Sequence, residues 1–238
     1  MRRIGAGIIV AVPILIYSFA AAEISFAENS TSSDSSSAFQ TVIAIQKALQ
    51  DKNYEEAWQQ RTKLSRQWQG LDEFKLRMER DPALREGISS ANIKKIEPVT
   101  SRRMWVNASS SYQQFNGFYL VKENGKWKQG NLRQYIRKAR SDLRILARAI
   151  RVYYRNNKRF PSELSELTVP ITYVKTISQD PFSDEAKPYV YKILDEGWIL
   201  YSLGPDSDDD FGFTTYNPKS GPVSNGDIVV KSKLPEGP

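Results

Sequence analysis

One stretch constrains the fold more than any other, the segment "NLRQYIRKARSDLRILARAIRVYYRNNKRFPSEL" over residues 131–164. Apolar residues recur in it at intervals of four and three, at Leu132, Ile136, Ala139, Leu143, Leu146, Ile150 and Tyr153. This spacing predicts a long amphipathic helix with one continuous apolar stripe. Asn156 and Asn157 should end the helix, and Pro161 prevents it from resuming. We expect the stripe to pack on a sheet.

That sheet is predicted to follow the helix. The runs "YVYKI" (residues 189–193) and "GWILYSL" (residues 197–203) read as strands joined by the turn "LDEG", and "GDIVVKS" (residues 226–232) reads as a third strand. A long helix on a small antiparallel sheet is therefore expected over residues 133–238.

The residues before this helix predict a second folded region, over 38–132. Helical spacing of apolar residues runs from Phe39 to Leu49, the segment "DKNYEEAW" interrupts it, and further helices follow. The period then changes to strands, with "ENGKW" (residues 123–127) as a hairpin turn. Helices followed by a curled antiparallel sheet indicate an α+β fold, so the chain is predicted to be α+β with two domains.

The N-terminus has the layout of an export signal. Arg2 and Arg3 precede an apolar stretch from Ile4 to about Ala22, and small residues ending at Ala27 offer a cleavage site. We expect a signal peptide over residues 1–27 and an exported protein, periplasmic or extracellular. The alternative is an uncleaved membrane anchor over residues 4–22, and membrane contact is expected only then. The Ser-rich segment 28–37 is predicted to be an unstructured linker.

The composition removes several kinds of chemistry. The chain has no cysteine and no histidine, so disulfides, thiol catalysis, histidine-based triads and zinc sites built on these residues are impossible. Residues 135–159 carry nine basic side chains and one acidic side chain, Asp142. In an exported protein we interpret this basic helix as a solvated face, and a nucleic-acid partner is not expected.

The first region resembles the nuclear transport factor 2-like fold, in the segments "DKNYEEAW" and "GFYLVKENGKWKQGNL". The resemblance implies a cone of helices over a strongly bent sheet, and family members include enzymes as well as binding modules. Five aromatic residues could line a pocket in the cone or simply form its core: Tyr54, Trp58, Trp68, Trp105 and Phe118. A small-ligand-binding module, or an enzyme, using this pocket is the alternative function.

The second region is similar to the globular domain of the major pseudopilin of type II secretion systems. The segments that carry this similarity are "SDLRILARAIRVYYRNNKRFPSEL", "QDPFSDEAKPYVY" and "ILYSLGPDSDDD" followed by "GDIV". A pseudopilin, however, runs its apolar assembly helix straight into the globular helix, whereas here a linker and a whole domain intervene. Polymerisation by that mechanism is therefore not expected.

The stretch "GPDSDDDFGF" raises the question of a metal site. A hard cation such as Ca²⁺ prefers carboxylate and carbonyl oxygens, and Asp206, Asp208 and Asp210 match the first three ligand positions of an EF-hand loop. Phe211 replaces the required glycine and Asn217 the bidentate glutamate, so an EF-hand is rejected. On composition alone, a hydrated turn and a metal-binding loop both remain open.

The pseudopilin resemblance implies a structural calcium site in this loop. Matched position by position, Asp206 and Asp227 are the carboxylate ligands, and Ser202 and Leu203 stand near the backbone carbonyls that complete the site. Asp208 and Asp210 are further candidates, although the longer loop here gives them no counterpart in the family. Together these expectations describe an exported, non-enzymatic protein, without catalytic residues or an organic cofactor. Its expected partner is a protein of the cell envelope, near a type II secretion or pilus-like system.

Overall fold

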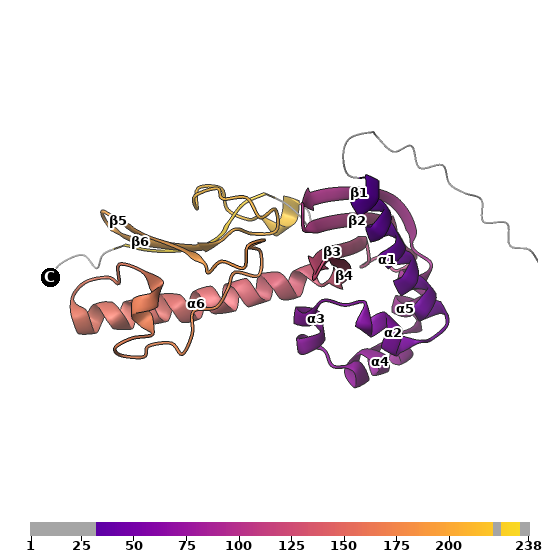
Figure 1. The fold of residues 1–238 in the computed structure, drawn as a ribbon, viewed down its shortest axis with the longest axis horizontal. Helices are drawn as coiled ribbons and strands as arrows, with labels where there is room; N and C mark the ends of the chain where they lie inside the picture. Colours follow the sequence, from indigo (N-terminus) through magenta and orange to yellow (C-terminus); the bar gives the residue numbers. More distant parts are fainter. Residues whose placement is uncertain (1–31, 221–224, 234–238) are drawn as a thin grey trace, which may run out of the picture. The chain divides into compact units, whose positions relative to one another are not determined.

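The computed structural model of the protein describes residues 32–220 and 225–233. It contains helices and two antiparallel sheets, which confirms the predicted α+β fold (Figure 1). The export signal expected over residues 1–27 lies outside the described residues. Among those that are described, no helix is both long and apolar enough to cross a membrane.

Helix α1 (Ser32–Gln50) begins inside the segment that was expected to be a linker. The expectation of an unstructured linker is therefore wrong for residues 32–37. Two tertiary features explain the helix: the Asp34 carboxylate accepts a hydrogen bond from Lys122 Nζ at 2.7 Å, and Ser35 is buried. Asp34 also lies in the first helical turn, where a negative charge is favourable. Neither the hydrogen bond from Lys122 nor the burial of Ser35 can be predicted from the composition of the segment.

Four short helices follow: α2 (Tyr54–Gln59), α3 (Lys63–Trp68), α4 (Leu71–Arg80) and α5 (Pro82–Ser89). The expected interruption at "DKNYEEAW" is confined to residues 51–53, because Asn53 caps α2 by accepting from the Glu56 N–H. Thr62 and Asp81 cap α3 and α5 in the same way. Each capping side chain accepts from a backbone N–H that the start of a helix leaves without a partner. A new helix therefore begins at each cap, and the region consists of short helices.

The first sheet has the order β1 (Asn92–Thr100), β2 (Arg103–Ser109), β3 (Gly117–Glu123) and β4 (Lys126–Gly130). Asn124 and Gly125 form the predicted turn between β3 and β4, both with positive φ as such hairpins require. The two faces of β2 and β3 enter different cores. Met104, Val106 and Leu120 pack with α1, α2, α4 and α5, whereas Trp105, Tyr119 and Val121 belong to a core built around α6.

Helix α6 (Leu132–Asn157) is the long helix that the sequence predicts, and its buried residues include Leu132, Leu143 and Ile150. It packs on a second sheet with the order β5 (Val190–Leu194), β6 (Gly197–Ser202) and β7 (Ile228–Lys233). Two short 3-10 helices, η1 (Leu164–Leu167) and η2 (Pro218–Ser220), lie in the connecting segments. The third strand begins two residues later than expected.

The central strand β6 is buried at every residue. Trp198 and Leu200 face the core with α6. On the other face, the segment between β6 and β7 covers Ile199 and Tyr201, where Gly212 approaches both side chains closely. Strand β6 is thus enclosed between a helix and a loop. This long loop, residues 203–227, is called the acidic loop below.

Candidate metal centre

The acidic loop begins at a buried carboxylate clamp that sequence reasoning missed. Asp180 is 3% exposed, and its Oδ1 accepts from the Phe182 N–H at 3.0 Å and from Ser202 Oγ at 2.8 Å. Its Oδ2 accepts from the Leu203 N–H at 2.8 Å. An aspartate directly before a proline often accepts from the backbone two residues on. That signal was present in "QDPF", but its link to Ser202 and Leu203 arises from the tertiary structure.

Two glycines allow the two ends of the acidic loop to meet. Gly204 has φ +72°, and a Cβ atom there would lie 2.1 Å from the Gly226 carbonyl oxygen. Gly226 has φ +113°, and a Cβ atom there would lie 2.6 Å from the Thr215 backbone. Any other residue at either position would combine backbone strain with a clash. These contacts explain why "SLG" and "GD" stand at the two ends of the loop.

Asp206 and Asp227, the two principal predicted ligands, lie at this junction, and each uses one carboxylate oxygen. Asp206 Oδ2 accepts from the Gly226 N–H at 2.8 Å, and Asp227 Oδ2 accepts from the Gly212 N–H at 2.7 Å. The other oxygen of each, Oδ1, is buried and has no hydrogen-bond partner among the described residues. Buried carboxylate oxygens without a partner are costly, so this pair of atoms requires an explanation.

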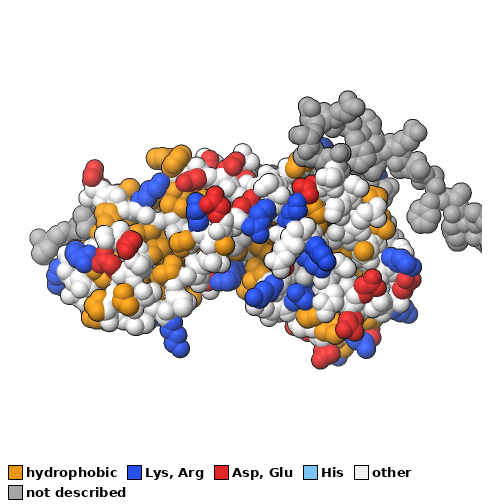
Figure 2. Space-filling model, in the orientation of Figure 1, with side chains coloured by type: hydrophobic (Ala, Val, Ile, Leu, Met, Phe, Trp, Pro, Cys, Tyr) orange, Lys and Arg blue, Asp and Glu red, His pale blue; other side chains and the backbone are white. Residues whose placement is uncertain are grey.

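Buried oxygens without a hydrogen-bond partner also occur on the segment between Asp206 and Asp227. Asp210 Oδ2 and Ser207 Oγ are also buried and lack a partner within the part of the chain that the structure describes. Asp209 differs, because its Oδ1 accepts from Tyr201 Oη at 2.8 Å and from the Phe211 N–H at 2.9 Å. Asp208 is exposed. The unsatisfied oxygens therefore belong to Asp206, Asp210 and Asp227. Figure 2 shows acidic side chains gathered over this part of the molecule.

Burial and mutual repulsion shift the titration of this group. Burial raises the pKa of Asp227 to about 7, and the charges of Asp210, Asp209 and Asp206 add to the shift. Burial also raises the pKa of Asp206, to which the charge of Asp210 contributes. A nearby cation would reverse both shifts, because it favours the ionised form.

The donor chemistry of these residues fits a hard cation such as Ca²⁺, which takes carboxylate, carbonyl and hydroxyl oxygens. Asp206, Asp210 and Asp227 would supply the charge. Among the described residues, however, no three acidic side chains stand close enough to form a ready metal centre. The hydrogen bonds from the Gly212 and Gly226 N–H groups hold one oxygen of each principal carboxylate instead.

The remaining predicted ligands have different surroundings. Ser202 is buried, and its hydroxyl donates to Asp180; the Leu203 N–H does the same, which places both residues at the start of the acidic loop. The side chain of Asp208 is exposed, and this residue reaches the group through its backbone N–H, which donates to the Asp206 carboxylate. The structure thus brings Asp206, Asp210 and Asp227 into one electrostatic group and leaves Asp208 at its edge.

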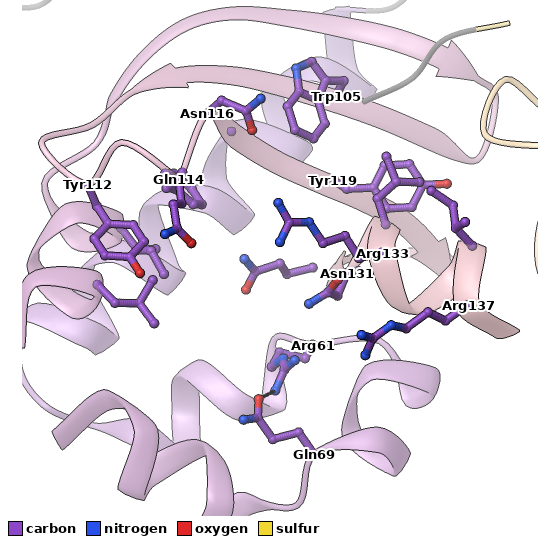
Figure 3. Close-up of a pocket in the computed structure, with 18 of the residues that line it drawn as sticks. Arg61, Gln69, Trp105, Tyr112, Gln114, Asn116, Tyr119, Asn131, Arg133 and Arg137 are labelled. Atoms are coloured by element: carbon purple, nitrogen blue, oxygen red, sulfur yellow. Dashed lines mark hydrogen bonds between the residues drawn. The ribbon is translucent and has the colours of Figure 1, made fainter. Parts of the chain in front are cut away.

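The aromatic residues predicted to line a pocket in the first region are mostly core residues. Tyr54 and Phe118 are buried in the core that α1, α2, α4 and α5 form with the first sheet, and Trp58 Nε1 donates to the Gln69 carbonyl at 2.9 Å. Trp68 is 43% exposed. Trp105 lines a pocket, to which the other four do not contribute. That pocket has a volume of about 750 Å³ and is shown in Figure 3.

Comparisons with protein-family models, with curated proteins and with solved structures found no match. The chemistry of the two sites therefore has to be argued from their own residues.

Proposed function

We propose that this chain is an exported, non-enzymatic protein with a calcium-stabilised, pseudopilin-like domain that acts as an interaction component of a bacterial cell envelope. The observation that carries the proposal is the set of buried, unpartnered oxygens on Asp206, Asp210 and Asp227. Two of these atoms, on Asp206 and Asp227, lie where the two ends of the acidic loop meet, and a structural cation is what would satisfy them.

The order of elements in the second region supports the pseudopilin likeness. A long helix, a Pro-containing segment, two strands, an acidic loop and a last strand follow one another as in the segments that carry the resemblance. The first region places an additional sheet and helices before this unit. We propose that the protein works beside a type II secretion or pilus-like system through protein contacts.

The acidic loop also offers a reason why a cation would matter for interaction. Phe213 is 85% exposed and Phe211 is 57% exposed, and they flank Gly212, whose N–H is held by Asp227. Large exposed aromatic side chains are frequent at protein interfaces. A cation at Asp227 would therefore fix the backbone that presents these two rings. Lys192 Nζ lies 4.7 Å from the centre of the Phe211 ring and supports it from β5.

The test is thermal and chemical unfolding of the full chain in calcium, in magnesium and in chelator. Calcium at about a hundredfold excess over its dissociation constant should raise the free energy of unfolding by about 2.7 kcal/mol. Asp227→Asn and Asp206→Asn should lose this rise. Asp195→Asn, which removes the same charge from the exposed turn between β5 and β6, should keep it.

A parent protein whose stability is the same in calcium and in chelator would contradict the proposal. The acidic loop would then be a hydrated turn closed by hydrogen bonds. A second candidate function, ligand binding in the pocket of Figure 3, is supported by a separate observation and is developed next.

A further inference from the structure

The pocket of about 750 Å³ is strongly asymmetric in charge. Six basic side chains line it and no carboxylate does, among the residues that the structure describes. The basic residues come from four parts of the chain: α6, the segment between α2 and α3, α4, and η2. None of the six forms an ion pair with a described carboxylate. Figure 2 shows basic side chains gathered over the start of α6.

Arg61 is the decisive residue because it is only 6% exposed. Its Nη1 donates to Gln69 Oε1 at 2.9 Å, and its guanidinium lies 5.1 Å from the centre of the Phe74 ring. Both contacts are with neutral groups. A buried guanidinium normally has a carboxylate or phosphate partner, since its charge is costly to remove from water. Burial and the charge of Arg77 lower the pKa of Arg61 to about 10.

Two arginines of α6 complete the cationic side. In Figure 3 the side chains of Arg133 and Arg137 extend from α6 toward the middle of the pocket, and Arg61 approaches from the opposite side together with Gln69. Arg133 and Arg137 are four residues apart and so lie on one face of the helix. Three guanidinium groups thus face one space, in an arrangement suited to an anionic oxygen group.

The rest of the lining is apolar and aromatic. Phe74 and Met78 come from α4, and Trp105 comes from β2. Trp105 and Tyr119 border the pocket on the side of the first sheet (Figure 3). The volume lies within the range typical of small-molecule sites, which combine a mostly apolar wall with a few polar groups. An inorganic anion alone would leave this wall in contact with water.

We propose that this pocket binds a small amphipathic organic anion, with its carboxylate or phosphate group at Arg61, Arg133 and Arg137 and its apolar part against Phe74, Met78 and Trp105. This inference does not require a cation at the acidic loop, although Tyr216, Pro218 and Lys219 of that loop also line the pocket. Carboxylate and phosphate share the chemistry that the three guanidinium groups recognise, and the probes below distinguish them.

The experiment uses isothermal titration calorimetry of the full chain with octanoate, octyl phosphate and 1-octanol. These probes share an eight-carbon tail and differ only in the head group. At least one anion should bind about tenfold or more tightly than octanol, since a charge-assisted hydrogen bond contributes enough for that factor. Raising the salt concentration should weaken the anions more than octanol, because salt screens the attraction.

Two double variants locate the site. Arg133→Gln/Arg137→Gln should weaken the preferred anion about tenfold or more and leave octanol unchanged. The control Arg80→Gln/Arg144→Gln removes the same charge from exposed positions of α4 and α6 that do not line the pocket, and it should bind as the parent does. Arg61→Gln is a weaker test because a buried residue is replaced, so its result counts only if its unfolding curve matches that of the parent.

Three results would overturn the proposal. One is octanol binding as tightly as both anions, a second is undiminished anion binding by Arg133→Gln/Arg137→Gln, and a third is no anion binding at about 1 mM. A preference for octyl phosphate over octanoate, or the reverse, supports the proposal and identifies the head group.

Discussion

Glu166 and Asp227 are carboxylates of the same region with opposite surroundings. Glu166 accepts hydrogen bonds from Arg159, from the Ser162 N–H and hydroxyl and from the Tyr153 hydroxyl. These donors, the Arg159 guanidinium first, hold its pKa far below its usual range. Asp227 accepts one backbone hydrogen bond, and burial beside other carboxylates raises its pKa to about 7.

The two carboxylates differ in whether the protein itself supplies their hydrogen-bond and ion-pair partners. Around Glu166 the chain provides a cation and several donors, so this carboxylate stabilises the fold without a bound ion. In the acidic loop, Asp206, Asp210 and Asp227 form no ion pair with a described basic side chain. The pocket at Arg61 is the reverse case, with cations and no carboxylate. The unpaired carboxylates therefore indicate a cation as the candidate ligand, and the unpaired basic side chains indicate an anion.

The largest expected effect on stability comes from replacing Asp180, a carboxylate whose hydrogen-bond partners the protein itself supplies. Asp180→Ala should lower the free energy of unfolding by about 3 kcal/mol, because the donors of Phe182, Ser202 and Leu203 lose their acceptor in a buried position. Urea unfolding measures this loss. Asp195→Ala, on the surface, should change stability by less than about 0.5 kcal/mol. Equal effects of the two substitutions would show that Asp180 is no clamp.

The next effect changes sign with calcium. In chelator, Asp227→Asn should raise the free energy of unfolding by about 1 kcal/mol, because a buried carboxylate that repels its neighbours becomes neutral. In saturating calcium the same substitution should lower it relative to the parent by about 2 kcal/mol, since a ligand is lost. Thermal unfolding in both conditions gives the two values. The same sign in both would remove the distinction drawn between Asp227 and Glu166.

A pH series sharpens the comparison further. The folded-state pKa of Asp227 exceeds its unfolded value, so its contribution is fully present below pH 4 or so and is lost as the pH rises toward about 7. In chelator, stability should therefore fall over this window, by at most about 1.4 kcal/mol per pH unit for one proton. Urea midpoints of the parent and of Asp227→Asn measure the slope. An equal slope in both would place the titration elsewhere.

The smallest effect concerns Glu166, whose folded-state pKa is lowered. Its contribution is present above its unfolded pKa and is lost as the pH falls through and below it, the opposite direction from Asp227. Glu166→Gln should cost about 1 kcal/mol at neutral pH, since the site is partly exposed. At about pH 3 the difference between parent and variant should be smaller than at neutral pH, because part of the contribution is then lost. Urea unfolding at both pH values tests this, and a pH-independent difference would indicate lost packing instead.

The sequence by itself determined the elements whose physics is local. The apolar stripe from Leu132 to Tyr153 fixes a helix because its spacing matches the helical period. Asn124-Gly125 fixes a hairpin because these residues tolerate positive φ. The α+β class followed from the change of period along the chain. Asp206 and Asp227 were found as candidate ligands through the segments that resemble a pseudopilin.

Tertiary structure decided what depends on partners distant in sequence. Ser32 to Ser37 reads as linker by composition, but contacts of Asp34 and Ser35 make it helical. Asp180 became the clamp of the acidic loop because folding brings Ser202 and Leu203 to its carboxylate. Arg137 belongs to the basic stretch 135–159 that the sequence predicts to be a solvated face, but folding places it, together with Arg133, opposite Arg61 (Figure 3). The spacing of apolar residues along the sequence predicts which face of a helix or strand is buried. Only the folded chain determines which charged side chains meet and which remain without a counterpart.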